Sequence, residues 1–226
     1  MNDKISKIIA LLNKAYGEKK WKKSHEPLDQ LIQTILSQNT SDRNSYVAFS
    51  SLKRKYPSWE SLMEASVDEI AETIKVGGLE NIKAERIRSI LIAIKEKRQN
   101  LDLSYLKKLP KEEAFSFLTT LKGVGPKTAA VVLLFSFGKP VLPVDTHIHR
   151  VSKRLGLIGN ADRIKAHKML QQMVPDEQVY SFHINMIEHG RKICKSKPKC
   201  PECVLSSVCE SASYFYPELK NLKTKK

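Results

Sequence analysis

The chain has 226 residues, 41% of them apolar, and its 39 basic and 24 acidic side chains leave a net charge of +15. The composition is that of a globular protein, and the longest apolar run, Ala129 to Phe135, is too short to span a membrane. The basic excess favours a polyanionic partner, although a basic surface that is merely solvated would have the same composition.

The length suits one large domain or two small ones, with enough chain to bury a sizeable core. The first residues lack the continuous apolar block and small-residue cleavage site of a secretion signal. We therefore expect a cytoplasmic, nucleoid-associated protein that makes no membrane contact and acts as a monomer.

Nearly every segment has helical periodicity, and alternating strand patterns are missing, which predicts an all-α fold. The pattern predicts helices over Ile5–Tyr16 and Pro27–Leu36, a third capped by Ser41 or Asp42, and a short one with the capping box Ser66-Val67-Asp68-Glu69. Further helices are expected to start at Asn81, Pro110 and Pro126 and, beyond Arg150, at Asn160 and Pro175-Asp176.

The most informative stretch is a glycine turn between two of these helices. Gly123-Val124-Gly125 is followed by Pro126, which suits the first position of a helix, so Lys127 is expected in that helix's first turn. A phosphate-binding P-loop would need Gly immediately before its Lys, where this chain has Pro126. A dinucleotide fingerprint would need a preceding strand, whereas 118–121 reads as a helix end. The next segment opens with Asp145, a natural cap residue.

Four cysteines lie in one short segment with the spacing C-x5-C-x2-C-x5-C: Cys194, Cys200, Cys203 and Cys209. Disulfides are disfavoured in a chain without a secretion signal. Structural zinc is a rival, but zinc sites usually pair two C-x2-C knuckles. A single C-x2-C with wider flanking gaps suits a [4Fe–4S] cluster wrapped by one loop.

The stretch from Leu121 to Ala129 resembles the helix-hairpin-helix of the endonuclease III family of DNA glycosylases. The stretch from Val144 to Ile148 resembles that family's loop with a catalytic aspartate, and the downstream cysteines resemble its iron–sulfur segment. The resemblance runs from about Pro27 to Cys209. Many bacterial members have six residues in the first cysteine gap, where this chain has five, which affects the expected loop shape more than the expected cluster.

The resemblance implies two domains with the active site in a cleft between them. One is a helical barrel over 25–139 that contains the helix-hairpin-helix. The other joins 1–24 to 140–226 and carries the aspartate loop and the [4Fe–4S] loop. The implied activity is that of a bifunctional DNA glycosylase/AP lyase that excises oxidised pyrimidines from duplex DNA.

Such chemistry needs an amine that attacks C1′ of the sugar, expels the base and remains as a Schiff base, after which β-elimination breaks the strand on the 3′ side. An ordinary lysine amine is protonated at neutral pH, but a helix N-terminus and closure on DNA both favour its neutral form. Lys127 is the expected nucleophile. Asp145 is expected to accept a proton or to stabilise the positive charge that develops on the sugar.

Further residues are expected to contact DNA. Gly123, Val124 and Gly125 of the hairpin would hold the phosphate backbone through main-chain amides, with Thr128 as a further DNA contact, and the hairpin could accommodate a monovalent cation. The flipped base leaves a gap that family members fill from two loops, here Asn39, with Gln38 as the substitute, and Leu79. Lys197 and Lys199 could reach phosphates from the cysteine loop.

Other functions remain open at this point. A monofunctional G:T or G:U mismatch glycosylase is disfavoured because such relatives tend to have another residue at the Lys127 position. An adenine glycosylase is disfavoured on the same ground. A non-catalytic helix-hairpin-helix module would not need both Lys127 and Asp145.

Overall fold

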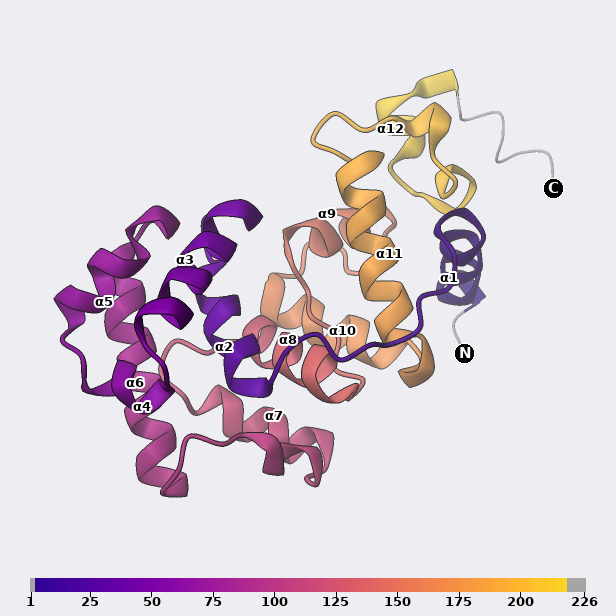
Figure 1. Ribbon diagram of the computed structural model, residues 1–226. Helices are drawn as coiled ribbons and strands as arrows, with labels where there is room; N and C mark the ends of the chain where they lie inside the picture. The colour runs from indigo at the N-terminus through magenta and orange to yellow at the C-terminus, as the bar shows by residue number, and fades with distance from the viewer. Residues whose placement is uncertain (1–2, 219–226) are drawn as a thin grey trace. The chain divides into compact units, whose positions relative to one another are not determined.

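The computed structural model describes residues 3–218, which fold into helices joined by loops, with no strand in this range (Figure 1). The chain divides into two compact units. Unit 1 comprises Met1–Lys22 and Pro140–Lys226, and unit 2 comprises Lys23–Lys139. Between residues 3 and 218 no helix combines the length and the apolarity that crossing a bilayer requires.

Unit 2 contains seven α-helices in the described chain. They are α2 (Pro27–Leu36), α3 (Asp42–Lys55), α4 (Trp59–Glu64), α5 (Val67–Ile74), α6 (Glu80–Arg98), α7 (Lys111–Thr119) and α8 (Pro126–Phe137), with short 3-10 turns at Lys75–Gly77 and Ser104–Lys107. The cap expected at Ser41 and the capping box of Ser66 and Glu69 are both present. Helix α6 begins one residue before the expected Asn81.

The core of unit 2 is centred on α8. Eight of its twelve residues are buried, so it is apolar on nearly all sides rather than on one stripe. It packs against α2, whose inward residues Leu28, Leu31, Ile32 and Ile35 are 4% exposed or less, and against α7. This packing fixes the first turn of α8 in unit 2.

Unit 1 contains α1 (Asp3–Tyr16), α9 (Thr146–Arg154), α10 (Arg163–Met173), α11 (Val179–Lys192) and α12 (Ala212–Phe215). Two further 3-10 turns lie within the cysteine segment, at Cys200–Glu202 and Ser206–Val208, and a third, Asp176–Gln178, precedes α11. The expectation that α10 starts at Asn160 is wrong, because the side chain of Asp162 caps it by accepting from the amide of Lys165 at 2.8 Å.

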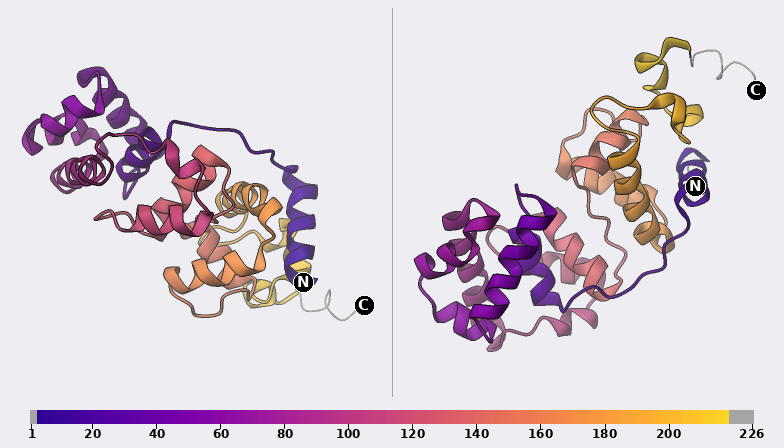
Figure 2. Two further views of the ribbon diagram at one scale, coloured as in Figure 1. Left: turned by 90° about the horizontal axis from the view of Figure 1, so that it is seen from below. Right: turned by 45° about the horizontal axis from the view of Figure 1, so that its top comes forward.

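Helix α1 lies beside α11, although more than 160 residues separate them in the chain (Figures 1 and 2). Asn13 of α1 is the polar centre of this contact. Its Oδ1 accepts from Ser181 Oγ at 2.9 Å and from Asn185 Nδ2 at 3.0 Å. The apolar residues of α1 complete the interface, since Ile5, Ile8 and Leu12 are 1% exposed or less.

Helices α9 and α11 approach closely at Gly190. A Cβ placed on Gly190 would lie 2.9 Å from Cβ of His147, so a larger residue would push the two helices apart. This contact positions α9, whose N-cap is Asp145, against the helix that leads into the cysteine segment.

Candidate functional site

The hairpin of unit 2 is the turn between α7 and α8. Gly123 has φ +86°, a left-handed conformation that favours glycine. The amide of Val124 donates to the carbonyl of Leu121 at 2.9 Å, and the Val124 side chain is buried. The Val124 amide, which we expected to hold DNA, is therefore already used within the turn. Gly123 and Gly125 donate in none of the loop and turn backbone bonds found among the described residues.

The two positions of this turn differ in why glycine is suited to them. Gly123 needs its positive φ. Gly125 has φ −86°, which any residue adopts, and a Cβ added there meets nothing within 4 Å. The fold of unit 2 thus does not require glycine at 125, whereas close approach of a ligand backbone would.

Lys127 is exposed in the first turn of α8, as expected. It lines an open pocket of about 400 Å³ within unit 2, and most of the residues around this pocket are of polar type. The remaining lining residues are Ser24, His25, Gln30, Gln33, Thr34, Ser37, Asp42, Ser45, Tyr46, Val131 and Phe135. Thr128 differs from its neighbour, because its side chain is buried and only its backbone amide lies at the open helix end.

The loop residues expected to fill a gap in DNA share an unusual backbone. Asn39 (φ 53°) and Leu79 (φ 54°) are both left-handed, which costs a bulky residue such as leucine about 1–2 kcal/mol. Both are exposed, Leu79 by 47%. Gln38 is half-buried, and its side-chain oxygen is held by Arg86. Strain retained at an exposed position is typical of a functional site.

Two basic residues of α6 near these loops were missed at the sequence level. Lys83 is 2% exposed, and its Nζ donates to the carbonyls of Leu36 (2.9 Å) and Gly77 (2.8 Å). Burial lowers the pKa of Lys83. Arg86 donates from Nη1 to Oε1 of Gln38 at 2.6 Å. A lysine in an otherwise apolar position of the α6 pattern is the signal that would have identified the first.

In unit 1, Asp145 is the N-cap of α9, as the sequence predicts. Its Oδ1 accepts from the amide of Ile148 at 2.8 Å, and the residue is half-buried. The extended segment before it is held by buried side chains. The ring of His167 bonds to the carbonyl of Leu142 at 2.8 Å, and that of His183 bonds to the carbonyl of Pro143 at 3.0 Å.

Two arginines of α9 hold the start of the cysteine segment. Arg150 Nε donates to the carbonyl of Cys194 at 2.9 Å. Arg154 Nη1 lies 3.3 Å from Sγ of Cys194, and its Nη2 donates to the carbonyl of Ser196 at 2.9 Å. The helix that Asp145 caps thus also anchors the first cysteine.

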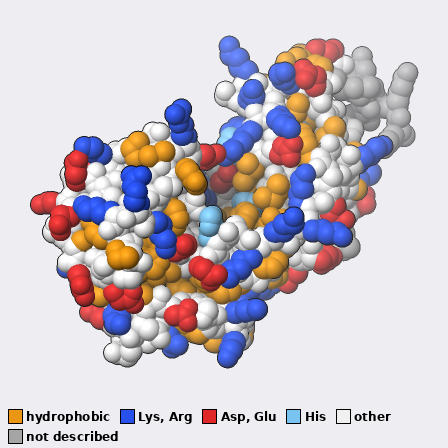
Figure 3. All heavy atoms as spheres, viewed as in Figure 1, with side chains coloured by type: hydrophobic (Ala, Val, Ile, Leu, Met, Phe, Trp, Pro, Cys, Tyr) orange, Lys and Arg blue, Asp and Glu red, His pale blue; other side chains and the backbone are white. Residues whose placement is uncertain are grey.

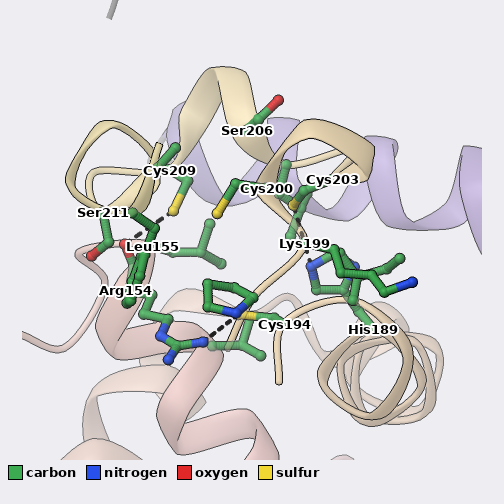
Figure 4. A pocket seen from close by; sticks show the side chains of 16 residues that line it. Arg154, Leu155, His189, Cys194, Lys199, Cys200, Cys203, Ser206, Cys209 and Ser211 are labelled. Carbon is green, nitrogen blue, oxygen red and sulfur yellow. Dashed lines mark hydrogen bonds between the residues drawn. The ribbon is translucent and has the colours of Figure 1, made fainter. Parts of the chain in front are cut away.

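All four cysteines line one pocket in unit 1, whose other walls are mostly apolar (Figure 4). None of the four forms a disulfide, and Cys194 and Cys200 are buried. No three His, Cys, Asp or Glu side chains of the described chain are arranged to coordinate one metal ion. Four thiols spread around a pocket suit a cluster, in which each iron takes one cysteine, better than a single zinc ion, which needs all four at one point.

The environment of these thiols is poorly solvated. Burial, together with the charges of the other three cysteines, raises the pKa of Cys203 to about 12. His189 is 1% exposed, and burial lowers its pKa to about 4, so the ring is neutral. Its Nδ1 bonds to the hydroxyl of Tyr16 at 2.9 Å, and its Nε2 lies 3.5 Å from Sγ of Cys203.

The basic side chains are dispersed. In Figure 3, lysine and arginine are scattered over the visible face of each unit rather than gathered in one patch. Lys197 and Lys199 of the cysteine segment are exposed, and Lys199 forms an ion pair with Glu202 at 3.6 Å. The lysine-rich tail beyond residue 218 lies outside the described residues.

Comparison with known proteins gives a consistent result. Residues 32–176 match the HhH-GPD superfamily of base excision DNA repair proteins. The chain is 34% identical to an endonuclease III of Sulfolobus acidocaldarius, over 84% of this chain and 83% of that protein. It is 40% identical to a putative DNA glycosylase of Arabidopsis thaliana over 76% of this chain, but it spans only 59% of that protein.

Solved structures are similar as well. A trapped covalent intermediate of an endonuclease III with DNA matches with a TM-score of 0.81 and 30% identity, covering 95% of this chain and 99% of that one. A non-covalent complex of an endonuclease III with DNA matches with a TM-score of 0.79 at the same identity.

Proposed function

Because the chain belongs to the HhH-GPD superfamily and, within it, to the endonuclease III family, we propose that it is a bifunctional DNA glycosylase/AP lyase. Its substrate is duplex DNA with an oxidised pyrimidine or an abasic site. The observation that carries this proposal is the exposed Lys127, at the start of α8, directly after the hairpin turn and beside an open pocket.

Lys127 is the nucleophile in this proposal. Its neutral amine forms a bond to C1′ while the bond from C1′ to the base breaks, and the base leaves with a proton. The sugar ring then opens as the C1′–O4′ bond breaks and O4′ takes up a proton, which gives a Schiff base whose C2′ proton is acidic. Its removal breaks the C3′–O bond, and water then releases the enzyme. The first turn of α8 supports this role, because its positive dipole end disfavours a protonated amine.

Asp145 serves the same reaction through its charge. A carboxylate stabilises the positive charge that develops on the sugar as the base leaves, and it accepts a proton from the attacking amine. Its position supports this role, because the cap bond to Ile148 holds the carboxylate in one orientation.

The hairpin turn is proposed to hold the DNA backbone. Amides at the start of a helix bind phosphate oxygens, and the turn contributes those of Gly123 and Gly125. The open space beside Gly125 supports close approach of the phosphate. Lys127 would then lie within two residues of the bound backbone. A monovalent cation at the same turn remains part of the proposal.

The gap left by the extruded nucleotide is proposed to be filled by Asn39 and Leu79. Both residues are exposed and have a left-handed backbone. Such a backbone persists only where the surrounding structure holds it, so the place from which each side chain projects is fixed. The open pocket beside Lys127 is the proposed place for the extruded base.

Cys194, Cys200, Cys203 and Cys209 are proposed to hold a [4Fe–4S] cluster. The donor set, the shared apolar pocket and the arginine beside Cys194 fit a group that carries negative charge on its thiolates. Its contribution is structural, because glycosidic cleavage is not a redox reaction. Bound there, it ties together the segment from which Lys197 and Lys199 project.

The proposal is tested by covalent trapping. The wild-type protein, incubated with a duplex bearing an abasic site and with borohydride, should form a reduced protein–DNA adduct. Lys127→Gln should lose the adduct and strand cleavage while it still binds DNA. Lys122→Gln, which removes an exposed lysine from the other side of the turn, is the matched control and should keep both.

Persistence of the adduct in Lys127→Gln would show that another amine does the chemistry. A wild-type protein that binds the duplex but neither forms an adduct nor cleaves it would overturn the assignment as a lyase. A panel of duplexes, each with one lesion or mismatch, then identifies the base that is removed.

A further inference from the structure

Helix α6 carries two basic side chains one turn apart, Lys83 and Arg86, which therefore project from the same side of the helix. Neither is needed to form the helix, and neither forms an ion pair in the described residues. Both instead bond to loops that come from other parts of unit 2.

Lys83 joins two of these loops from inside the fold. Its buried Nζ bonds to the carbonyl of Leu36, where α2 ends and the 37–40 loop begins. It also bonds to the carbonyl of Gly77, two residues before Leu79. The two loops proposed to enter DNA are therefore hydrogen-bonded, near the start of each, to the same ammonium group.

Arg86 joins the first of these loops to the hairpin turn. Its Nη1 donates to Oε1 of Gln38, the residue before the exposed Asn39. The same side chain packs against Gly123, because a Cβ added there would clash with Nε and Cδ of Arg86. One guanidinium side chain thus touches both the 37–40 loop and the turn proposed to hold phosphate.

This arrangement sets the distance between the loop that would enter DNA and the turn that would hold phosphate. A side chain that enters the base stack must do so at a fixed offset from the phosphates that the protein holds. Packing of α2 against α8 brings the 37–40 loop near the hairpin turn, but the loop lies beyond the end of α2 and a direct contact is what fixes its offset from the turn. A planar guanidinium that is held by a short hydrogen bond can fix this offset, because the side chain keeps little conformational freedom.

We propose that Arg86 is a positioning residue, which sets the 37–40 loop against the hairpin turn so that Asn39 enters DNA in register with the bound backbone. The inference rests on the proposed function and deepens it. Lys83 fixes the base of the same loop, and Arg86 fixes its tip. Arg86 itself touches neither the sugar nor the base in this proposal.

The experiment uses a duplex with 2-aminopurine opposite a tetrahydrofuran abasic analogue, which the enzyme binds but cannot cleave. Entry of the loop unstacks the 2-aminopurine and raises its fluorescence. At saturating protein, Arg86→Met should give a smaller rise than the wild type, with Arg86→Lys in between. Single-turnover excision of the lesion base should slow by about tenfold or more in Arg86→Met, as expected when a contact is misplaced by an ångström or so.

The matched control is Arg88→Met. Arg88 lies on the same helix and bonds through Nε to the carbonyls of Met63 and Ala65, away from these loops. It should show the wild-type fluorescence rise. A double-mutant cycle with Gln38→Ala completes the test, because Arg86→Met should add little once Gln38 is gone.

Gln38→Ala also serves if Arg86→Met proves unstable, since it removes the same bond from the loop side. A full fluorescence rise and wild-type excision in both Arg86→Met and Gln38→Ala would overturn the inference. So would an Arg86→Met defect confined to DNA affinity and its salt dependence, which would make Arg86 a phosphate contact. Adduct formation on an abasic duplex tests the proposed function separately.

Discussion

Asp145 Oδ1 lies 2.8 Å from the backbone nitrogen of Ile148, so the carboxylate proposed for catalysis also caps α9. The two roles can be separated by substitution, because asparagine caps helices as well as aspartate does but carries no charge. Asp145→Asn should keep its melting temperature and its affinity for DNA while excision slows by about 2–4 powers of ten.

Asp145→Ala is the companion variant, since it removes both the charge and the cap. It should slow excision to a similar degree and, in addition, lose about 1 kcal/mol of stability in thermal unfolding. An Asp145→Asn protein that excises at the wild-type rate would show that the residue is only a cap.

Leu79 offers a case in which stability and activity should move in opposite directions. Its left-handed backbone is strained, so Leu79→Gly relieves about 1–2 kcal/mol, partly offset by the greater freedom of glycine in the unfolded chain. We expect an equal or higher melting temperature together with slower excision, because the side chain that enters DNA is gone.

The control for Leu79→Gly is Ile82→Gly, in the first turn of α6. Ile82 is likewise exposed, by 55%, but has helical geometry, so glycine should cost stability there, about 1 kcal/mol. Excision by Leu79→Gly at the wild-type rate would remove Leu79 from the DNA-contacting residues.

The affinity for undamaged duplex should fall steeply with salt, because basic side chains that neutralise phosphates release counterions. Lys197→Ala should lower the slope of log affinity against log salt by about one. Lys14→Ala, the same change of charge in an exposed residue of α1, is the comparison. Equal changes of slope in both would mean that overall charge, and not the cysteine segment, is responsible.

The cofactor is checked by metal analysis of the purified protein. A [4Fe–4S] cluster predicts iron and acid-labile sulfide in equal amounts, a brown colour and no zinc. Replacing Cys203 by serine should reduce the iron content and destabilise unit 1, because one of the four proposed cluster ligands is lost. Zinc without iron would contradict the assignment.

Acidification should destabilise the protein through His167. Burial lowers the pKa of this ring, so the folded state binds fewer protons than the unfolded state, whose histidine titrates near 6.5. Stability is therefore expected to fall as the pH drops below about 6.5. His167→Gln, which cannot be protonated, should make stability depend less on pH, as measured by urea titrations at several pH values. The pH dependence that remains then comes from other groups, such as His189.

Much of the fold is predictable because each signal is local. The cap at Ser41, the box at Ser66 and the turn at Gly123 depend on residues within four positions of one another. Helix α4 was missed, since its six residues bury only Leu62 and show no periodicity. The start of α10 was placed two residues early because Asn160 and Asp162 are both good caps and only the fold selects one.

Some residues of the candidate site are also predictable from local sequence, whereas others depend on how the helices pack. Lys127 and Asp145 were assigned to helix starts from their neighbours in sequence, and both lie at helix starts. Arg86 could not be assigned, because its partners Gln38 and Gly123 become neighbours only when α2, α6 and α8 pack. The burial of Thr128 has the same origin, since it depends on what α8 packs against.

The pairing of α1 with α11 has a consequence for synthesis on the ribosome. Unit 2 is encoded without interruption, so it can fold while the rest of the chain is still being translated. Helix α1 precedes unit 2 in the chain but packs against α11, which follows it, so Ile5, Ile8 and Leu12 are not covered until α11 has been translated. A segment that is translated before unit 2 is thus protected only after unit 2 is complete, and a chaperone would be needed to cover it in the meantime.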